Sequence, residues 1–193
     1  MVSDPVRVAL IVAEALEACR VRYLVGGSLA SAVSGEPRST LDVDLVVELS
    51  EKDIEPFIAA LGDRFHVDSD ALRRAIRERS TANMIHYATS TKVDLFMAGG
   101  SPLDKQQMDR RQRIQASTDP DGWLYVYTPE DILLQKLRWY RMGNEVSDRQ
   151  WRDIMGIILV QGDRLDQAYL HHGAETLGVS DLLQRALSET RGE

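Results

Sequence analysis

The spacing of the apolar residues changes along the chain, and this change limits the folds that the chain can adopt. Residues 6–19 place apolar groups at helical intervals, whereas Tyr23-Leu24-Val25 is a short apolar run that Gly26-Gly27 ends. After Thr128 the pattern predicts three or four helices and no strand. We therefore expect an α/β architecture, a small mixed sheet flanked by helices, followed by a helical region.

Turn and capping signals divide the chain further. Thr128, Pro129 and two following acids predict the start of a strong helix. A capping box at 50–53 predicts a helix over 51–61, and Ser69 or Asp70 is expected to cap a helix over 68–79. Other expected elements are a helix at 28–33, a strand at 43–49, an antiparallel hairpin of 84–87 with 91–97, a helical segment at 102–113 and a strand at 123–127. We predict a catalytic domain over 1–115 and a helical region over 116–193 packed on it.

Length and charge exclude several classes of protein. The chain has 193 residues, enough for one domain or a catalytic domain with a helical extension. Its formal charge of −7 argues against a protein that coats nucleic acid. No apolar run approaches the roughly 20 residues of a membrane span, and no secretory signal is visible. The single cysteine, Cys19, fits a reducing compartment, so we expect a cytoplasmic protein without a membrane partner.

Gly26-Gly27-Ser28 lies between a predicted strand and a predicted helix. Glycine lets the backbone turn sharply and approach a ligand closely. The Ser28 hydroxyl and the free N–H groups of the following helix would add an anion-binding end. The segment is therefore a candidate phosphate cradle, although Gly-Gly turns also occur without any ligand.

Three acids accompany the predicted strands. Asp42 and Asp44 are two residues apart, so on a strand they point to the same side. Two neighbouring carboxylates repel each other unless a cation joins them, and Mg²⁺ is typically held by such groups. Asp94 is a single acid within an apolar strand, where an unpaired carboxylate is costly. If the strands are neighbours, the acids converge on a two-metal site; the alternatives are a solvated pair and an edge strand with Asp94 in water.

The combination of these features resembles a known family. Gly27-Ser28, then Asp42-Val43-Asp44, then a hydrophobic strand with Asp94 resembles the nucleotidyltransferase fold of the DNA polymerase β superfamily. Within it, Gly26-Gly27-Ser28-Leu29-Ala30 and the segment 38–45 resemble the type IV abortive-infection (AbiE) toxins. The close resemblance covers residues 21–97. The segment 128–137 resembles the helix that follows the catalytic sheet in these proteins.

The resemblance implies a role for each matching residue. Gly27 and Ser28 would hold a triphosphate, and Arg38 and Thr40 would face the same cleft. Asp42 and Asp44 would bind Mg²⁺ or Mn²⁺. Asp94 would be a third metal ligand or the general base. Lys136 would neutralise phosphate charge, and its alternative interpretation is a solvated helix position.

The activity that follows is transfer of NMP from an NTP to an acceptor hydroxyl. The resemblance favours an RNA or tRNA end, or a protein side chain, with an antitoxin as a possible partner. The alternatives are a nucleotidyltransferase that modifies a small antibiotic, and a nucleotide-binding antitoxin or sensor without turnover. Two arginine clusters are candidate RNA contacts or solvated faces: residues 73–79 and residues 110–113.

Overall fold

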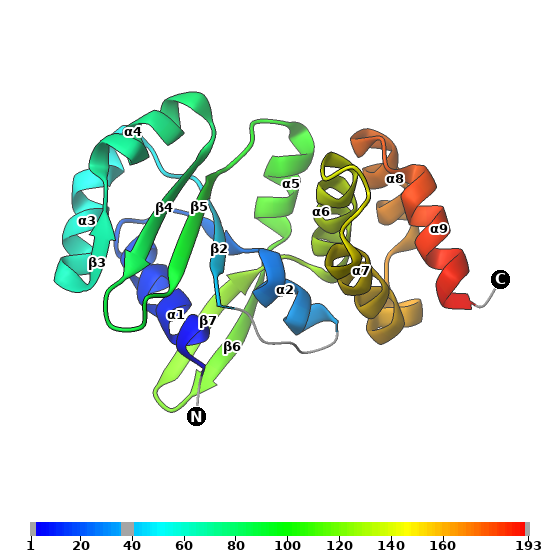
Figure 1. Cartoon of the computed structure of the whole chain (residues 1–193), viewed down its shortest axis with the longest axis horizontal. Coiled ribbons are helices and arrows are strands. Elements are labelled where there is room, and N and C mark those ends of the chain that lie inside the picture. Colours follow the sequence, from blue (N-terminus) through cyan, green and yellow to red (C-terminus); the bar gives the residue numbers. More distant parts are fainter. Residues whose placement is uncertain (1–2, 36–40, 192–193) are drawn as a thin grey trace. The chain divides into compact units, whose positions relative to one another are not determined.

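The computed structural model describes residues 3–35 and 41–191 (Figure 1). The chain divides into two compact units. The first contains the described parts of Met1–Leu29 and Ser39–Val126, and the second those of Ala30–Arg38 and Tyr127–Glu193. Helix α2 (Gly27–Ser34) is divided between them. Arg38 and Thr40 lie outside the described residues.

The described strands all belong to one mixed sheet in the first unit, with the order β3-β4-β5-β2-β1-β7-β6. They are β1 (Tyr23–Val25), β2 (Val43–Val47), β3 (Phe65–Val67), β4 (Thr81–His86), β5 (Lys92–Met97), β6 (Gln112–Thr118) and β7 (Asp121–Val126). Strands β2 and β5 are parallel neighbours at the centre of the sheet. The predicted antiparallel hairpin is confirmed as β4 and β5, in which Met84 pairs with Val93.

Two strands were not predicted. Phe65–Val67 forms the edge strand β3, and Gln112–Thr118 forms β6, so the helix expected over 102–113 ends at Arg110. Strand β6 pairs with β7 in an antiparallel hairpin. Its polar sequence reflects this edge position, because most of its side chains are exposed or half-buried. Strand β3 has only three residues, and β6 has only two apolar residues, Ile114 and Ala116, so neither alternation is long enough to predict a strand.

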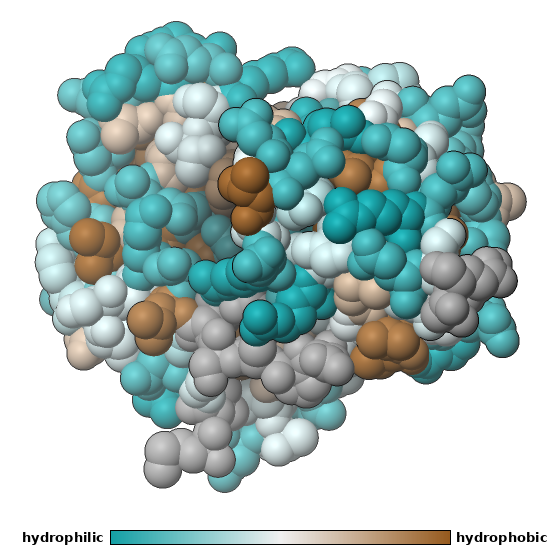
Figure 2. Space-filling view, turned by 45° about the vertical axis from the view of Figure 1, so that its right-hand side comes forward, coloured by the Kyte–Doolittle hydropathy of each residue, from teal (hydrophilic) through white to brown (hydrophobic). Residues whose placement is uncertain are grey.

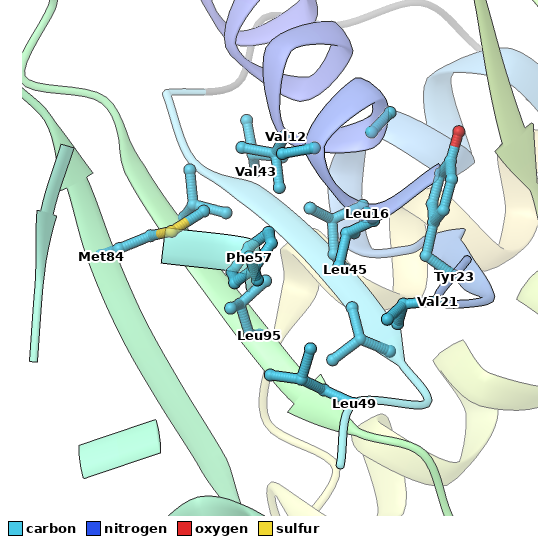
Figure 3. Close-up of a cluster of buried hydrophobic side chains, with 14 of the residues drawn as sticks. Val12, Leu16, Val21, Tyr23, Val43, Leu45, Leu49, Phe57, Met84 and Leu95 are labelled. Atoms are coloured by element: carbon cyan, nitrogen blue, oxygen red, sulfur yellow. The ribbon is translucent and has the colours of Figure 1, made fainter. Parts of the chain in front are cut away.

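The core of the first unit lies on one face of the sheet (Figure 3). Successive side chains of a strand point to opposite faces. In β2, Val43, Leu45 and Val47 are therefore fully buried, and Asp44 lies on the other face. The helices of this unit are α1 (Asp4–Ala18), α3 (Ile54–Leu61), α4 (Ser69–Glu78) and α5 (Pro102–Arg110), with short 3-10 turns at η1 (Glu51–Asp53) and η2 (Gly62–Arg64). Buried side chains of α1, α3 and α4 pack into this core.

Most helix termini form where the capping signals predicted them. The capping box of Ser50 and Asp53 is present, although its first turn is the 3-10 turn η1. The cap of α4 is different from the prediction. Asp68, not Ser69 or Asp70, accepts hydrogen bonds from the backbone N–H groups of Asp70 and Ala71. An extended backbone at Asp68 places its carboxylate over the first turn, which is the geometry of an N-cap.

The second unit is helical, as the sequence predicts. Its helices after residue 127 are α6 (Pro129–Met142), α7 (Asp148–Gln161), α8 (Gln167–Leu177) and α9 (Ser180–Arg191), with the 3-10 turn η3 (Gly162–Arg164). Thr128 caps α6 by accepting from the N–H of Asp131. The C-terminal half of α2 packs in this unit, where the Gln161 side-chain amide donates to the carbonyl of Ser34. None of the described helices has the length and apolar character needed to cross a membrane.

The surface is mainly hydrophilic on the face that Figure 2 shows, with apolar residues as separate spots. The arginine cluster of α4 is partly neutralised within the first unit. Arg73 pairs with Glu55 and Asp70, and Arg77 pairs with Glu51. These pairs favour the interpretation of this cluster as a solvated helix face.

Candidate active site

The face of the sheet opposite the α1 and α3 core carries two of the predicted acids side by side. Asp44 of β2 and Asp94 of β5 are paired residues on adjacent parallel strands. Neighbouring strands lie about 4.8 Å apart, so both carboxylates start from adjacent backbone positions on one face. Strand β5 lies between β4 and β2, and the Asp94 side chain is only 16% exposed. The alternative of an edge strand with Asp94 in water is therefore wrong.

Gly27 closes one side of this site. The backbone N–H of Gly26 donates to the Asp44 carbonyl at 2.8 Å. A Cβ atom added to Gly27 would lie 1.7 Å from Oδ2 of Asp44, which no real contact allows. Gly27 also has a φ of +54°, a conformation that side chains disfavour. The first glycine of helix α2 is thus required by the position of the Asp44 carboxylate and by its own backbone.

Lys92 is a cation that sequence reasoning missed. Its Nζ lies 2.8 Å from Oδ2 of Asp94, and its side chain is 48% exposed. The hydrogen bond to Asp94 raises the pKa of Lys92 above its ordinary value, and the negative charges of Asp94, Asp42 and Asp44 raise it further. One ammonium therefore lies within electrostatic reach of all three predicted acids. Asp44 and Asp94 are neighbours across the two strands, and Asp42 is two residues before Asp44. We call these three residues the acidic region.

The remaining acid and one amide complete the region. Asp42 is exposed and directly precedes β2. Asn83 of β4 is paired with Asp94, so Asn83, Asp94 and Asp44 form a polar row across three strands. This row lies on the face opposite the buried alternation of β4 and β2. The arrangement is suited to a cationic or hydrogen-bonding ligand.

The donor chemistry fits a hard divalent cation, because carboxylate oxygens are the preferred ligands of Mg²⁺. Among the described residues, no group of three or more His, Cys, Asp or Glu side chains is already arranged to hold a metal ion. Lys92 holds one oxygen of Asp94. A metal ion would therefore have to displace or reorient this ammonium to use both Asp44 and Asp94.

The other predicted site residues fall into two groups. Ser28 is the second residue of α2, directly after the Gly27 approach to Asp44. Arg38 and Thr40, which are outside the described residues, receive no structural account. Lys136 belongs to the second unit, in helix α6.

Lys136 is buried, so its interpretation as a solvated helix position is wrong. Its side chain is 2% exposed, and its Nζ donates to Oδ2 of Asp153 in α7 at 2.8 Å. Trp139, one turn further along α6, places its ring 5.9 Å from the same ammonium. Burial of a lysine requires such a carboxylate, because an isolated buried charge is very unfavourable.

The sequence analysis missed three polar residues that lie beside Asp94 or Lys136. Lys92 could have been found, because it is two residues before Asp94 and shares its face of the strand. Asn83 depends on the register of β4 and β5, which the sequence does not give. Asp153 depends on the packing of α7 against α6, which the sequence does not give.

The chain matches no protein-family model and no curated protein. It is similar to solved structures. An antigenic nucleotidyltransferase-like protein from Paracoccidioides brasiliensis is 17% identical with a TM-score of 0.53, over 97% of this chain and 94% of that chain. The antibiotic-resistance factor ANT(2″)-Ia is 14% identical with a TM-score of 0.55, over 100% of this chain and 98% of that chain.

The chain has the nucleotidyltransferase fold. The expected fold class is confirmed, including the mixed sheet and the helices that follow it. At these identities the likeness concerns the fold and not the substrate. The narrower resemblance to the AbiE toxins stays a prediction. Within this nucleotidyltransferase fold, Asp44 and Asp94 lie on adjacent parallel strands, and Gly27 begins helix α2 beside Asp44.

Proposed function

We propose that this chain transfers a nucleoside monophosphate from an NTP to an acceptor hydroxyl and releases pyrophosphate. One observation carries the proposal. Asp44 and Asp94 are paired on adjacent parallel strands, with Lys92 bonded to Asp94, beside a glycine turn that opens a helix. Such a concentration of carboxylates favours cations, and the turn offers N–H groups to phosphate. Acids and an anion-binding turn together are what phosphoryl chemistry requires.

The reaction balances with these residues. The acceptor oxygen forms a bond to the α-phosphorus, while the bond from that phosphorus to the pyrophosphate oxygen breaks. The hydroxyl proton passes to the Asp94 carboxylate or to water. Gly27 and Ser28 bind the triphosphate through the first turn of α2. Holding these groups in place beforehand lowers the barrier, because little reorganisation remains for the reaction itself.

Asp42, Asp44 and Asp94 would hold Mg²⁺ or Mn²⁺, which when bound neutralises developing charge on the phosphate oxygens. Lys92 donates to one oxygen of Asp94. Arg38 and Thr40 would contribute to phosphate binding, as the family resemblance implies. Lys136 would neutralise phosphate charge, as the family resemblance implies.

For the acceptor we propose a macromolecule, an RNA or tRNA end or a protein side chain. This follows the AbiE resemblance, which also implies a cytoplasmic toxin with an antitoxin partner. A second candidate is a small antibiotic acceptor. The observation that favours it is the likeness to ANT(2″)-Ia over the whole length of both chains. A third, a nucleotide sensor or antitoxin without turnover, predicts nucleotide binding alone.

The experiment incubates the full chain with each α-³²P-labelled NTP and Mg²⁺ or Mn²⁺. Total tRNA, the protein itself, a cell lysate and a panel of aminoglycosides are supplied as separate acceptors. We expect label transfer by the wild type and a loss of about 10³-fold in Asp94→Asn and in Asp44→Asn. Pyrophosphate release is measured in parallel.

The matched control is Asp63→Asn, the same chemical change at an exposed residue of η2. It should retain activity within about twofold, since it lies outside the acidic region. Label on tRNA or protein supports the macromolecular acceptor, and label on an aminoglycoside alone supports the second candidate. NTP binding without pyrophosphate release in every mixture would overturn the transferase proposal.

A further inference from the structure

The carboxyl ends of β2 and β5 border a cavity that lies away from the acidic region. Asp44 and Asp94 lie at the start of these parallel strands, whereas this cavity lies where they end, at Val47 and Met97. Three residues along β2 correspond to about 10 Å. The cavity has a volume of about 350 Å³. This is near the lower end of the range for sites that bind small molecules.

Two cations line this cavity. Arg79 follows α4, and Lys105 lies in the first half of α5. Neither side chain forms an ion pair with a carboxylate in the part of the chain that the structure describes. Two cations that line one space repel each other, and an anion bound between them would relieve this repulsion.

The Arg79 guanidinium lies beside the loop at Gly100. A Cβ on Gly100 would be 2.2 Å from Nη1 of Arg79, so the glycine leaves room for this approach. Arg79 itself has a left-handed backbone with a φ of +49°, an uncommon conformation for a residue other than glycine. Its exposed side chain therefore reaches the cavity from the end of α4.

The carboxylates nearby are already engaged. Glu48 lines the cavity, but its two oxygens accept from Nε and Nη2 of Arg22 at 2.6 and 2.8 Å. Asp104, beside Gly99, accepts from the backbone and the hydroxyl of Ser101 in the capping box of α5. Of the charged residues that line the cavity, Arg79 and Lys105 are positive and Glu48 is negative, so the lining carries one net positive charge.

The rest of the wall is apolar. Leu49, Ile76 and Met97 line the same cavity. Guanidinium and ammonium groups together suit a dianionic phosphate better than a single carboxylate, since a phosphate monoester carries about −1.5 to −2 at pH 7. We propose that this cavity binds an organic phosphate, whose phosphate contacts Arg79 and Lys105 and whose apolar body packs on Leu49, Ile76 and Met97.

The test is isothermal titration of the full chain with adenosine 5′-monophosphate, inorganic phosphate and adenosine, all in EDTA. We expect the monophosphate to bind more tightly than either fragment. Lys105→Met and Arg79→Met should each weaken it about tenfold, as for loss of a charged hydrogen bond. Arg77→Met is the matched control, because Arg77 pairs with Glu51 outside the cavity, and it should change affinity less than about twofold.

A second titration tests whether the monophosphate binds at the acidic region instead. The double variant Asp44→Asn/Asp94→Asn should bind the monophosphate as the wild type does. Circular dichroism confirms that each variant is folded. Lys105 is exposed on a helix, so its variant remains informative if Arg79→Met fails to fold. Absence of monophosphate binding at millimolar concentration would overturn the proposal. So would equal affinity for inorganic phosphate, or loss of binding in the double Asn variant.

Discussion

Two lysine–aspartate pairs in this molecule have the same length and different surroundings. Lys92 and Asp94 are 2.8 Å apart in the sheet unit, with side chains 48% and 16% exposed. Lys136 and Asp153 are also 2.8 Å apart in the helical unit, with side chains 2% and 6% exposed. The first ammonium donates to an acid on its own strand, whereas the second donates to an acid on the neighbouring helix.

The comparison teaches that a distance does not give the energy of an ion pair. Water screens the Lys92 pair, so breaking it costs little and another cation can take its place. The Lys136 pair lies in a dry interior, where removing one partner leaves an uncompensated charge. The exposed pair is therefore suited to a site where another cation can replace the lysine. The buried pair is suited to holding helices α6 and α7 together.

The largest effect is expected when the buried pair is broken. Lys136→Met should lower the free energy of unfolding by about 3–5 kcal/mol, because Asp153 is left buried without this ammonium. Urea unfolding followed by circular dichroism measures the loss. The double variant Lys136→Met/Asp153→Leu should recover much of it, since no charge is then buried. A loss below about 1 kcal/mol would mean that this pair is as well solvated as that of Lys92.

The second prediction concerns the backbone beside Asp44. Gly27→Ala should cost about 2–4 kcal/mol, because its Cβ would collide with the Asp44 carboxylate in addition to the strained φ. Gly178→Ala is the matched control, with a left-handed φ of +67° and ψ of 36° and open space around the added Cβ. It should cost about 1–2 kcal/mol. Equal losses in the two variants would show that Asp44 moves freely away from Gly27.

The third prediction tests whether a metal ion can replace the Lys92 ammonium beside Asp94. Lys92→Met should change the free energy of unfolding by less than about 1 kcal/mol, because nearly half of its side chain is in water. The same variant should bind Mn²⁺ several-fold more tightly, since the competing ammonium is gone. Paramagnetic broadening of NMR signals measures the affinity. Weaker Mn²⁺ binding would indicate that Lys92 organises the acids instead of competing for them.

The smallest effect is expected at His86, a buried histidine whose ring contacts a hydroxyl. Nδ1 of His86 lies 2.9 Å from the hydroxyl of Thr89, and the residue is 8% exposed. Burial lowers the pKa of His86, and the charge of Arg64 lowers it further. The unfolded chain therefore binds more protons as the pH falls below about 6.5, so stability should decrease there and level off below the folded pKa.

Urea unfolding from pH 7.5 to 5 tests this prediction. His86→Gln should flatten that part of the pH profile, whereas His66→Gln, at an exposed position of β3, should leave it unchanged. An identical profile in His86→Gln would show that another group controls the pH dependence.

Local sequence signals predicted much of the fold. Thr128 and Pro129 predicted the start of α6, because capping and proline preferences act within one turn. The largely apolar segment 91–97 predicted the strand that forms as β5. The prediction failed at β6, whose apolar alternation is too short to predict a strand and which becomes one through its pairing with β7. Short edge strands depend on a partner that the local sequence does not specify.

The same division applies to the acidic region. The residue types and spacing of Gly27, Asp42, Asp44 and Asp94 were visible in the sequence, because side chains two apart on a strand share a face. The pairing of Asp44 with Asp94, the collision that excludes a Cβ at Gly27 and the partner of Lys136 come from contacts between distant segments. The sequence by itself determined which chemical groups the chain carries and the local elements that hold them. Only the tertiary structure decided which groups meet and how much water reaches them, because register and burial arise from the packing of the whole unit.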